Sequence, residues 1–128
     1  MTFQINTASR TPIYQQLTAQ IRSAIARGEL SAEEQLPSVR QLSNELVVNP
    51  NTIARAYTEL EREGILTTRQ GLGVFVAPPR RELMKKVRDA RVQEHLNRLL
   101  TEAVHLGYSA DEVVAMVKRT LEEFQWPK

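Results

Sequence analysis

The 128-residue sequence predicts a mostly α-helical protein with one small β-hairpin near its middle and two further helices at its end. Apolar residues recur at three- to four-residue spacing in several stretches, which is typical of amphipathic helices. Two short β-prone runs flank Gln70-Gly71-Leu72-Gly73, which indicates a hairpin. Pro78-Pro79 then interrupts the chain before the last helical stretches. The sequence therefore predicts two parts joined by a short linker.

Composition excludes several classes of function. The chain contains no cysteine, so it has no disulfide framework, thiol nucleophile or cysteine-based zinc site. His95 and His105 have no carboxylate at metal-ligand spacing, and no pair of carboxylates has an obvious catalytic purpose. No apolar run approaches the ~18 residues of a membrane span, and the start of the chain lacks the regions of a signal peptide. We expect a cytoplasmic protein that is not an enzyme, has no cofactor and has no membrane partner.

Charge is nearly balanced overall, at +2 with a pI near 9.2, but it is unevenly distributed. Residues 1–79 carry seven basic and seven acidic side chains, residues 80–91 carry six and two, and residues 92–128 carry four and six. Affinity of the first part for nucleic acid must therefore come from charge placement on one face. The basic run within 80–91 fits either a solvated helix face or a contact with flanking phosphates.

The first helix is expected to follow an extended arm over residues 1–10. Thr11-Pro12 offers a cap and a proline at the first helical position, and Gly28 offers a stop. After a polar connector over 29–37, Ser38 and Gln41 have the spacing of a capping box that opens a second helix. Arg40 lies in its first turn, where the partial positive charge of the helix disfavours arginine by ~0.3 to 1 kcal/mol, which indicates an anionic or guanine partner.

The third helix is expected to begin at Asn49-Pro50 and to run to about Glu63, with Gly64 as its stop. Its apolar face consists of Ile53, Ala56, Tyr57 and Leu60. Its opposite face is formed by Asn51, Arg55, Thr58 and Arg62, with Thr52 and Ala54 on the flanks. Such side chains read base edges and phosphates in a major groove, although a solvated helix face has the same composition. Three glutamates after Thr58 limit the expected contact zone to the first half of the helix.

The hairpin after this helix has the position and size of a wing. Its two glycines permit a close approach to a sugar-phosphate backbone, and Arg69 and Gln70 lie beside them. A nucleotide-binding loop is a poor interpretation of Gly71-x-Gly73, because a strand follows it instead of a helix. The prediction is thus a winged helix-turn-helix DNA-binding domain over 1–77, a linker over 78–81 and a helical dimerisation domain over 82–128.

The helical tail is expected to form an αα-hairpin with an exposed apolar stripe. Apolar residues recur from Leu83 to Leu106, with a break conceivable near 88–91, and Ser109 and Glu112 form a second capping box. The stripe either packs against a second copy, which we favour, or folds back onto the winged domain of its own chain. The candidate dimer-interface residues are Leu96, Leu99, Leu100, Ala103, Val113, Val117, Leu121 and Phe124.

These motifs resemble the GntR family of bacterial transcription regulators, and the short tail is similar to that of its YtrA-type subfamily. The resemblance rests on Leu36-Pro37-Ser38-Val39-Arg40-Gln41-Leu42-Ser43, on Asn49-Pro50-Asn51-Thr52-Ile53, and on Gly71-x-Gly73-x-Phe75-Val76. It implies a homodimeric repressor that binds double-stranded DNA at a palindromic operator, often controlling its own operon and transporter genes. Where the family commonly has Pro-Gly, this chain has Ala32-Glu33, which leaves the geometry of the connector open.

By that resemblance Arg40 contacts a base or phosphate, Asn49, Asn51 and Thr52 act at the start of the recognition helix, and Gln70 and Gly71 form the wing tip. Together with the residues singled out above, the candidate DNA-binding set is Ser38, Arg40, Asn49, Asn51, Thr52, Arg55, Arg69, Gln70 and Gly71. For regulation, the sequence leaves two alternatives open: a small-molecule effector bound at the domain junction, or another kind of signal. The alternative function is a winged-helix module that binds another protein, for which the glutamates of the third helix are the main support.

Overall fold

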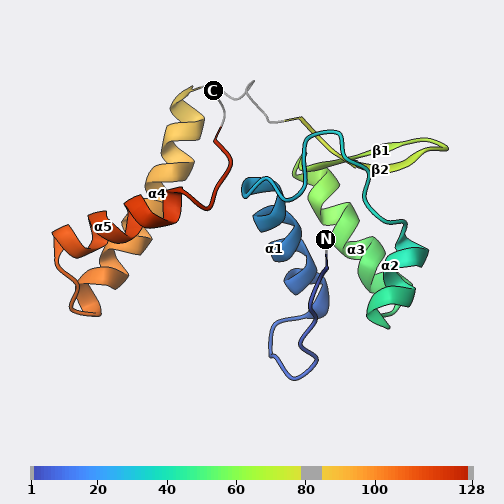
Figure 1. Ribbon diagram of the computed structural model, residues 1–128, viewed down its shortest axis with the longest axis horizontal. Helices are drawn as coiled ribbons and strands as arrows, with labels where there is room; N and C mark the ends of the chain where they lie inside the picture. Colours follow the sequence, from blue (N-terminus) through green and yellow to red (C-terminus); the bar gives the residue numbers. More distant parts are fainter. Residues whose placement is uncertain (1, 79–84, 127–128) are drawn as a thin grey trace. The chain divides into compact units, whose positions relative to one another are not determined.

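The computed structural model describes residues 2–78 and 85–126, which form two compact units (Figure 1). The first unit contains residues 2–78 together with Gln125 and Trp126, and the second contains residues 85–124. Most of the predicted linker, residues 79–81, lies outside the described residues. The described residues are mostly helical, with one two-stranded antiparallel sheet among them, as the sequence predicts.

Helix α1 spans Ile13–Ala26 and buries Leu17, Ile21 and Ala24. Gly28 follows the end of the helix as the predicted stop: this glycine has a φ of 79°, and the amides of Gly28 and Glu29 donate to the carbonyls of Ile25 and Ala24. The predicted start is wrong by one residue. Pro12 occupies the cap position, because its carbonyl accepts the first helical hydrogen bond from the Gln16 amide at 3.1 Å.

Helices α2 (Val39–Leu46) and α3 (Pro50–Arg62) form the helix-turn-helix. The predicted capping box is present, with the Ser38 hydroxyl accepting from the Gln41 amide and the Gln41 side chain accepting from the Ser38 amide. The turn is closed by the Ser43 hydroxyl, which donates to the Val48 carbonyl at 2.6 Å. Helix α3 begins at Asn49-Pro50 and stops at Gly64, and its predicted apolar face is buried.

The wing consists of β1 (Leu66–Arg69) and β2 (Gly73–Val76), with Arg69 opposite Gly73 at the tip. The connector before α2 pairs with β2 on the edge of the sheet, since the Leu36 amide donates to the Val74 carbonyl and the Val76 amide donates to the Glu34 carbonyl. The connector turns at Glu33, whose φ of 68° lies in the left-handed region that glycine favours. A glutamate thus takes the glycine conformation at the position where the family commonly has Pro-Gly.

The hydrophobic core of the first unit lies between α1, α2, α3, the base of the wing and the N-terminal arm. Leu17, Ile21, Ile53 and Leu60 are fully buried there. Phe3 also belongs to this core, although its sequence surroundings have no periodicity. Two glutamines of α1 hold the arm: Gln20 exchanges hydrogen bonds with the backbone of Gln4, and Gln16 does so with Asn6. The predicted arm is therefore held along α1 by these hydrogen bonds.

The second unit consists of α4 (Lys85–His105) and α5 (Ala110–Leu121). Helix α4 is continuous, without the break considered near 88–91, and α5 begins with the predicted capping box between Ser109 and Glu112. The hydrogen bonds of this box, first to the backbone of Ser109 and then to its side chain, lower the pKa of the Glu112 carboxyl. Among the helices that the structure describes, none is long and apolar enough to cross a membrane.

Val47, the C-cap of α2, provides a test of this backbone geometry. It has a φ of 55° and is 90% exposed, which is an unfavourable conformation for a β-branched residue that makes little packing in return. We expect Val47→Asn to raise the free energy of unfolding by about 1 kcal/mol, because asparagine tolerates the left-handed region. Urea unfolding would measure the change, and Val47→Ile, which keeps the branch, should leave stability unaltered.

Candidate nucleic-acid interface

The predicted DNA-contacting residues fall in three places on the first unit. Arg40 lies in the first turn of α2, Asn51, Thr52 and Arg55 lie in the first two turns of α3, and Gln70-Gly71 forms the tip of the wing. We call these residues the reader face. Its members are exposed except for the half-buried Thr52.

The reader face begins at two helix N-termini whose first turns contain no acidic residue. Partial positive charge at these ends is therefore not offset by a carboxylate of the same turn, as it is in α5 by Asp111 and Glu112. Within the described part of the chain, the Arg40 guanidinium has no hydrogen-bond or ion-pair partner. This arrangement favours an anionic partner at the start of α2 and α3.

The relative position of α2 and α3 is fixed by a buried tyrosine. The Tyr57 hydroxyl of α3 donates to the carbonyl of Pro37, just before α2, at 2.7 Å. Burial, assisted by the negative charge of Glu45, raises the pKa of Tyr57 far above its ordinary value, so the hydroxyl keeps its proton and remains a donor. This bond places the N-terminus of α2, and with it Arg40, beside the middle of α3.

Two of the candidate residues have a structural role as helix caps. The Ser38 hydroxyl accepts from the Gln41 amide, and the Asn49 side-chain oxygen accepts from the Asn51 amide at 2.8 Å. These bonds occupy the acceptor oxygens, but the amide nitrogen of Asn49 and the hydroxyl proton of Ser38 are still able to donate. The structure thus gives both residues a function in holding α2 and α3, in addition to the predicted contact.

Two of the candidate arginines lie over aromatic rings, which the sequence did not reveal. The guanidinium carbon of Arg55 lies 3.8 Å from the ring centroid of Tyr14 in α1. That of Arg69 lies 4.4 Å from the ring centroid of Phe75 on the facing strand, and Arg69 also approaches the Glu33 carboxylate at 3.7 Å. Arg69 is therefore partly engaged by a carboxylate of its own unit, whereas Arg55 has no carboxylate partner among the residues that the structure describes.

Gln35, which the sequence did not indicate as a functional residue, stabilises the wing tip. Its side-chain amide donates to the Leu72 carbonyl at 2.8 Å. The absence of a side chain at Gly73 makes room for it, since a Cβ there would lie 2.7 Å from the Gln35 nitrogen. Gly71, by contrast, has nothing within 4 Å of the position of a Cβ. A contact between sites so far apart in sequence leaves no local signal in the sequence.

The two wing glycines should therefore respond differently to alanine. Gly73→Ala introduces a side chain at a φ of 126° and displaces Gln35, so we expect a loss of about 1 to 3 kcal/mol in the free energy of unfolding. Gly71→Ala, with a φ of 77° and open space around it, should cost less stability but should weaken DNA binding if the tip approaches the sugar-phosphate backbone. Equal losses of stability would contradict the role assigned to Gln35; urea unfolding measures both.

The glutamates at the end of α3 are used inside the unit. Glu63 pairs with Arg22 of α1, the Glu61 carboxylate accepts from the Thr68 amide at 3.3 Å, and Glu59 pairs with Arg62 at 3.3 Å. The contacts of Glu63 and Glu61 join the end of α3 to α1 and to the wing, and that of Glu59 lies within α3. The main support for a protein-binding module is therefore accounted for by polar contacts within the unit.

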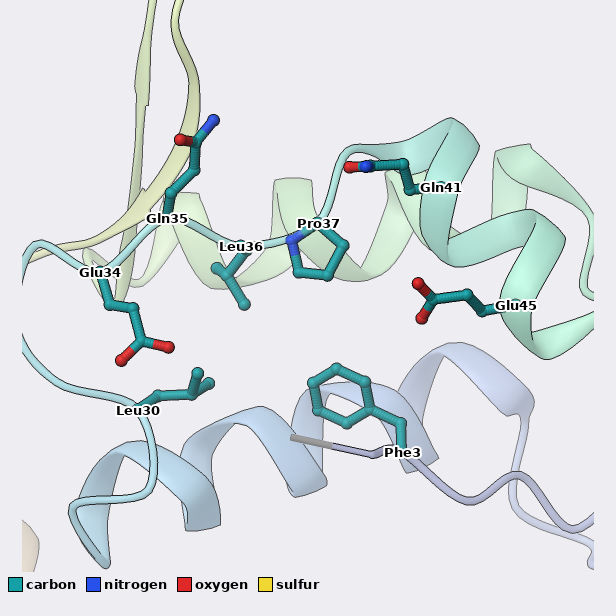
Figure 2. A pocket seen from close by; sticks show the side chains of 8 residues that line it. All are labelled: Phe3, Leu30, Glu34, Gln35, Leu36, Pro37, Gln41 and Glu45. Carbon is teal, nitrogen blue, oxygen red and sulfur yellow. The ribbon is translucent and has the colours of Figure 1, made fainter.

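A cavity of about 480 Å³ lies on the first unit between the N-terminal arm, the connector and α2 (Figure 2). Phe3 and Leu30 face Leu36 and Pro37 across it, while the carboxylates of Glu34 and Glu45 stand at its two ends (Figure 2). Carboxylates repel phosphate, so this cavity is not part of the reader face. Within the described residues, no group of three or more acidic or histidine side chains has the arrangement of a metal site.

The predicted dimer-interface residues all belong to the second unit. Ala103 is buried within this unit. Leu96, Leu99, Leu100, Val117 and Leu121 are each at least 40% exposed, and Val113 and Phe124 are half-buried. Lys85, Lys86, Arg88 and Arg91 of the basic run are exposed on α4, and Lys85 pairs with Asp89 at 3.1 Å. Arg80 and Arg81 lie outside the described residues.

Comparison with known proteins identifies the family of the chain. Residues 13–76 match the family model described as bacterial regulatory proteins, gntR family. The chain is 33% identical over 115 residues to the HTH-type transcriptional repressor YtrA of Bacillus subtilis, covering 90% of this chain and 88% of that protein.

Two solved structures are also similar. One is described as a transcriptional antiterminator from Listeria monocytogenes, with a TM-score of 0.78, 29% identity and coverage of 100% of this chain and 98% of that one. The other is the DNA-binding domain of AraR in complex with operator ORX1, with a TM-score of 0.54, 27% identity and coverage of 60% and 99%. The matched family consists of transcription regulators, not enzymes. The chain belongs to the GntR family of bacterial regulatory proteins and, within it, to the YtrA subfamily.

Proposed function

We propose that this protein is a cytoplasmic, sequence-specific double-stranded DNA-binding repressor that acts as a homodimer on a two-fold symmetric operator. The observation that carries the proposal is the reader face: Arg40 in α2 and Asn51 and Arg55 in α3 are exposed near helix N-termini whose first turns contain no acidic residue. A helix that presents its N-terminal residues in this way fits the major groove. In the same proposal, the wing tip contacts the sugar-phosphate backbone or the minor groove.

Support from relatives is of the same kind. The operator complex of AraR concerns a domain with the same fold, and the repressor YtrA is similar along nearly all of this chain. By the same resemblance we propose that the protein controls its own operon and transporter genes. Ligand titration would test whether a small-molecule effector binds the cavity on the first unit that is lined by Phe3 and Glu45.

The homodimer is supported by the exposed apolar residues of the second unit. Exposed large apolar side chains on α4 and α5 include Leu96, Leu99, Leu100, Val104, Val114, Val117 and Leu121. A surface of this kind on a water-exposed unit marks an interaction site. Most homo-oligomers are closed two-fold dimers, and two identical readers related by such an axis would recognise two identical half-sites.

A fluorescence-anisotropy titration tests the proposal. The labelled duplex carries the DNA upstream of the protein's own gene, and a duplex of scrambled sequence and the corresponding RNA serve as competitors. We expect tighter binding to the upstream duplex by ~10³-fold or more, with an affinity that falls as salt rises. Equal affinity for the upstream and scrambled duplexes would contradict sequence-specific binding. Tighter binding to the RNA than to the upstream duplex would contradict the proposed double-stranded DNA target.

A further inference from the structure

Tyr14 and Arg55 form a contact that links the helix-turn-helix to the first helix. Arg55 is in the second turn of α3, and its guanidinium carbon lies 3.8 Å from the centroid of the Tyr14 ring in the first turn of α1. The ring is half-buried against the core, and its hydroxyl accepts a hydrogen bond from the Gln15 side chain at 3.1 Å. Arg55 therefore rests on a rigid surface.

The position of Arg55 over the ring leaves its N–H donors without a carboxylate partner among the described residues. A guanidinium over a ring uses its flat face, while its five N–H donors point outward in the plane. Three other arginines of the unit, Arg22, Arg62 and Arg69, are placed by carboxylates that offset their charge. Arg55 is exposed and pairs with no carboxylate among residues 2–78 and 85–126, so an aromatic ring positions it without neutralising it.

We propose that Tyr14 is a positioning residue that holds Arg55 as a DNA phosphate clamp, separate from the base-reading side chains. The proposal rests on the DNA-binding function proposed above. The guanidinium lies on the side of α3 that faces α1, whereas Arg40 lies on α2, on the other helix packed against α3. Holding the long side chain before DNA arrives reduces the rotamer entropy lost on binding.

A phosphate contact and a base contact differ in measurable ways. Loss of a phosphate contact weakens binding about equally on any sequence and lowers the salt slope by about one. Loss of a base contact weakens the specific site alone. If the proposal is correct, Arg55→Ala reduces affinity for operator and scrambled duplex by similar factors, with the smaller slope in both.

The test is a double-mutant cycle on the full-length protein with Tyr14→Leu, Arg55→Ala and both together, and with Tyr14→Phe as the matched control. Tyr14→Leu keeps an apolar side chain but removes the ring, and should weaken DNA binding about 2- to 5-fold. Tyr14→Phe should bind like the parent. In the Arg55→Ala background Tyr14→Leu should have no further effect, because its role passes through Arg55.

In the free protein, ring currents should shift the side-chain protons of Arg55 upfield in the parent and in Tyr14→Phe, but not in Tyr14→Leu. The proposal is overturned if Tyr14→Leu binds DNA as tightly as the parent, or if it weakens binding equally with and without Arg55. If the parent still binds its operator, either of these results overturns the role of Tyr14 but leaves the proposed DNA-binding function unchanged. A parent that binds no duplex at all would overturn both.

Discussion

Arg40→Ala is expected to weaken operator binding by ~1 to 3 kcal/mol, the cost of losing one well-placed base contact. The residue stands two positions past the cap of α2, exposed and without an internal partner among the residues described. Its removal leaves the capping box of Ser38 and Gln41 intact, so stability should change little. Asn51→Ala is expected to have an effect of similar size, since Asn51 is exposed in the first turn of α3.

Arg62→Ala is the matched control for both variants. It removes the same charge as Arg40→Ala, but Arg62 lies at the end of α3 beside Glu59 and the other glutamates. Anisotropy titrations at several salt concentrations would compare the proteins. Parent-like affinity of Arg40→Ala and Asn51→Ala, or a larger loss for Arg62→Ala, would show that DNA approaches another part of α3.

Leu96→Glu combined with Leu100→Glu is expected to separate the homodimer. Both leucines are at least 40% exposed on one face of α4, where paired carboxylates in an apolar interface would be costly. Two linked readers gain affinity from effective concentration, so a monomer should bind a two-half-site operator ~100-fold or more weakly. Sedimentation velocity would measure the assembly, and anisotropy the affinity.

The control for this variant is Arg98→Gln with Thr101→Glu. It changes the net charge of α4 by the same amount, at exposed positions turned away from the leucine stripe. It should sediment as a dimer and bind like the parent. A double-leucine variant that remains dimeric at micromolar concentration would place the interface elsewhere and would favour the fold-back alternative for the tail.

Local patterns in the sequence predicted much of the fold. The capping boxes at Ser38 and Ser109 and the glycine stops at Gly28 and Gly64 depend on neighbouring residues, and all four are present. The family resemblance to GntR regulators is likewise confirmed, because its motif is carried by contiguous residues.

Contacts between distant segments were not predictable in the same way. Phe3 enters the core from an arm without periodicity, Gln35 reaches the wing tip, and Tyr14 lies under Arg55. Each depends on how two elements pack, and packing leaves no local pattern. The left-handed Glu33 shows the same limit, since the backbone there follows the pairing of the connector with β2 and not the preference of glutamate.

Footprinting with hydroxyl radicals on the DNA upstream of the protein's own gene tests the central claim most directly. A dimer that presents two α3 helices should protect two half-sites of inverted sequence on one side of the duplex, about one helical turn or a multiple of it apart. Protection should weaken in parallel at both half-sites with Arg40→Ala and should need far more protein with the double-leucine variant. A single unsymmetrical protected stretch, or uniform protection of any duplex, would contradict a dimeric operator-binding repressor.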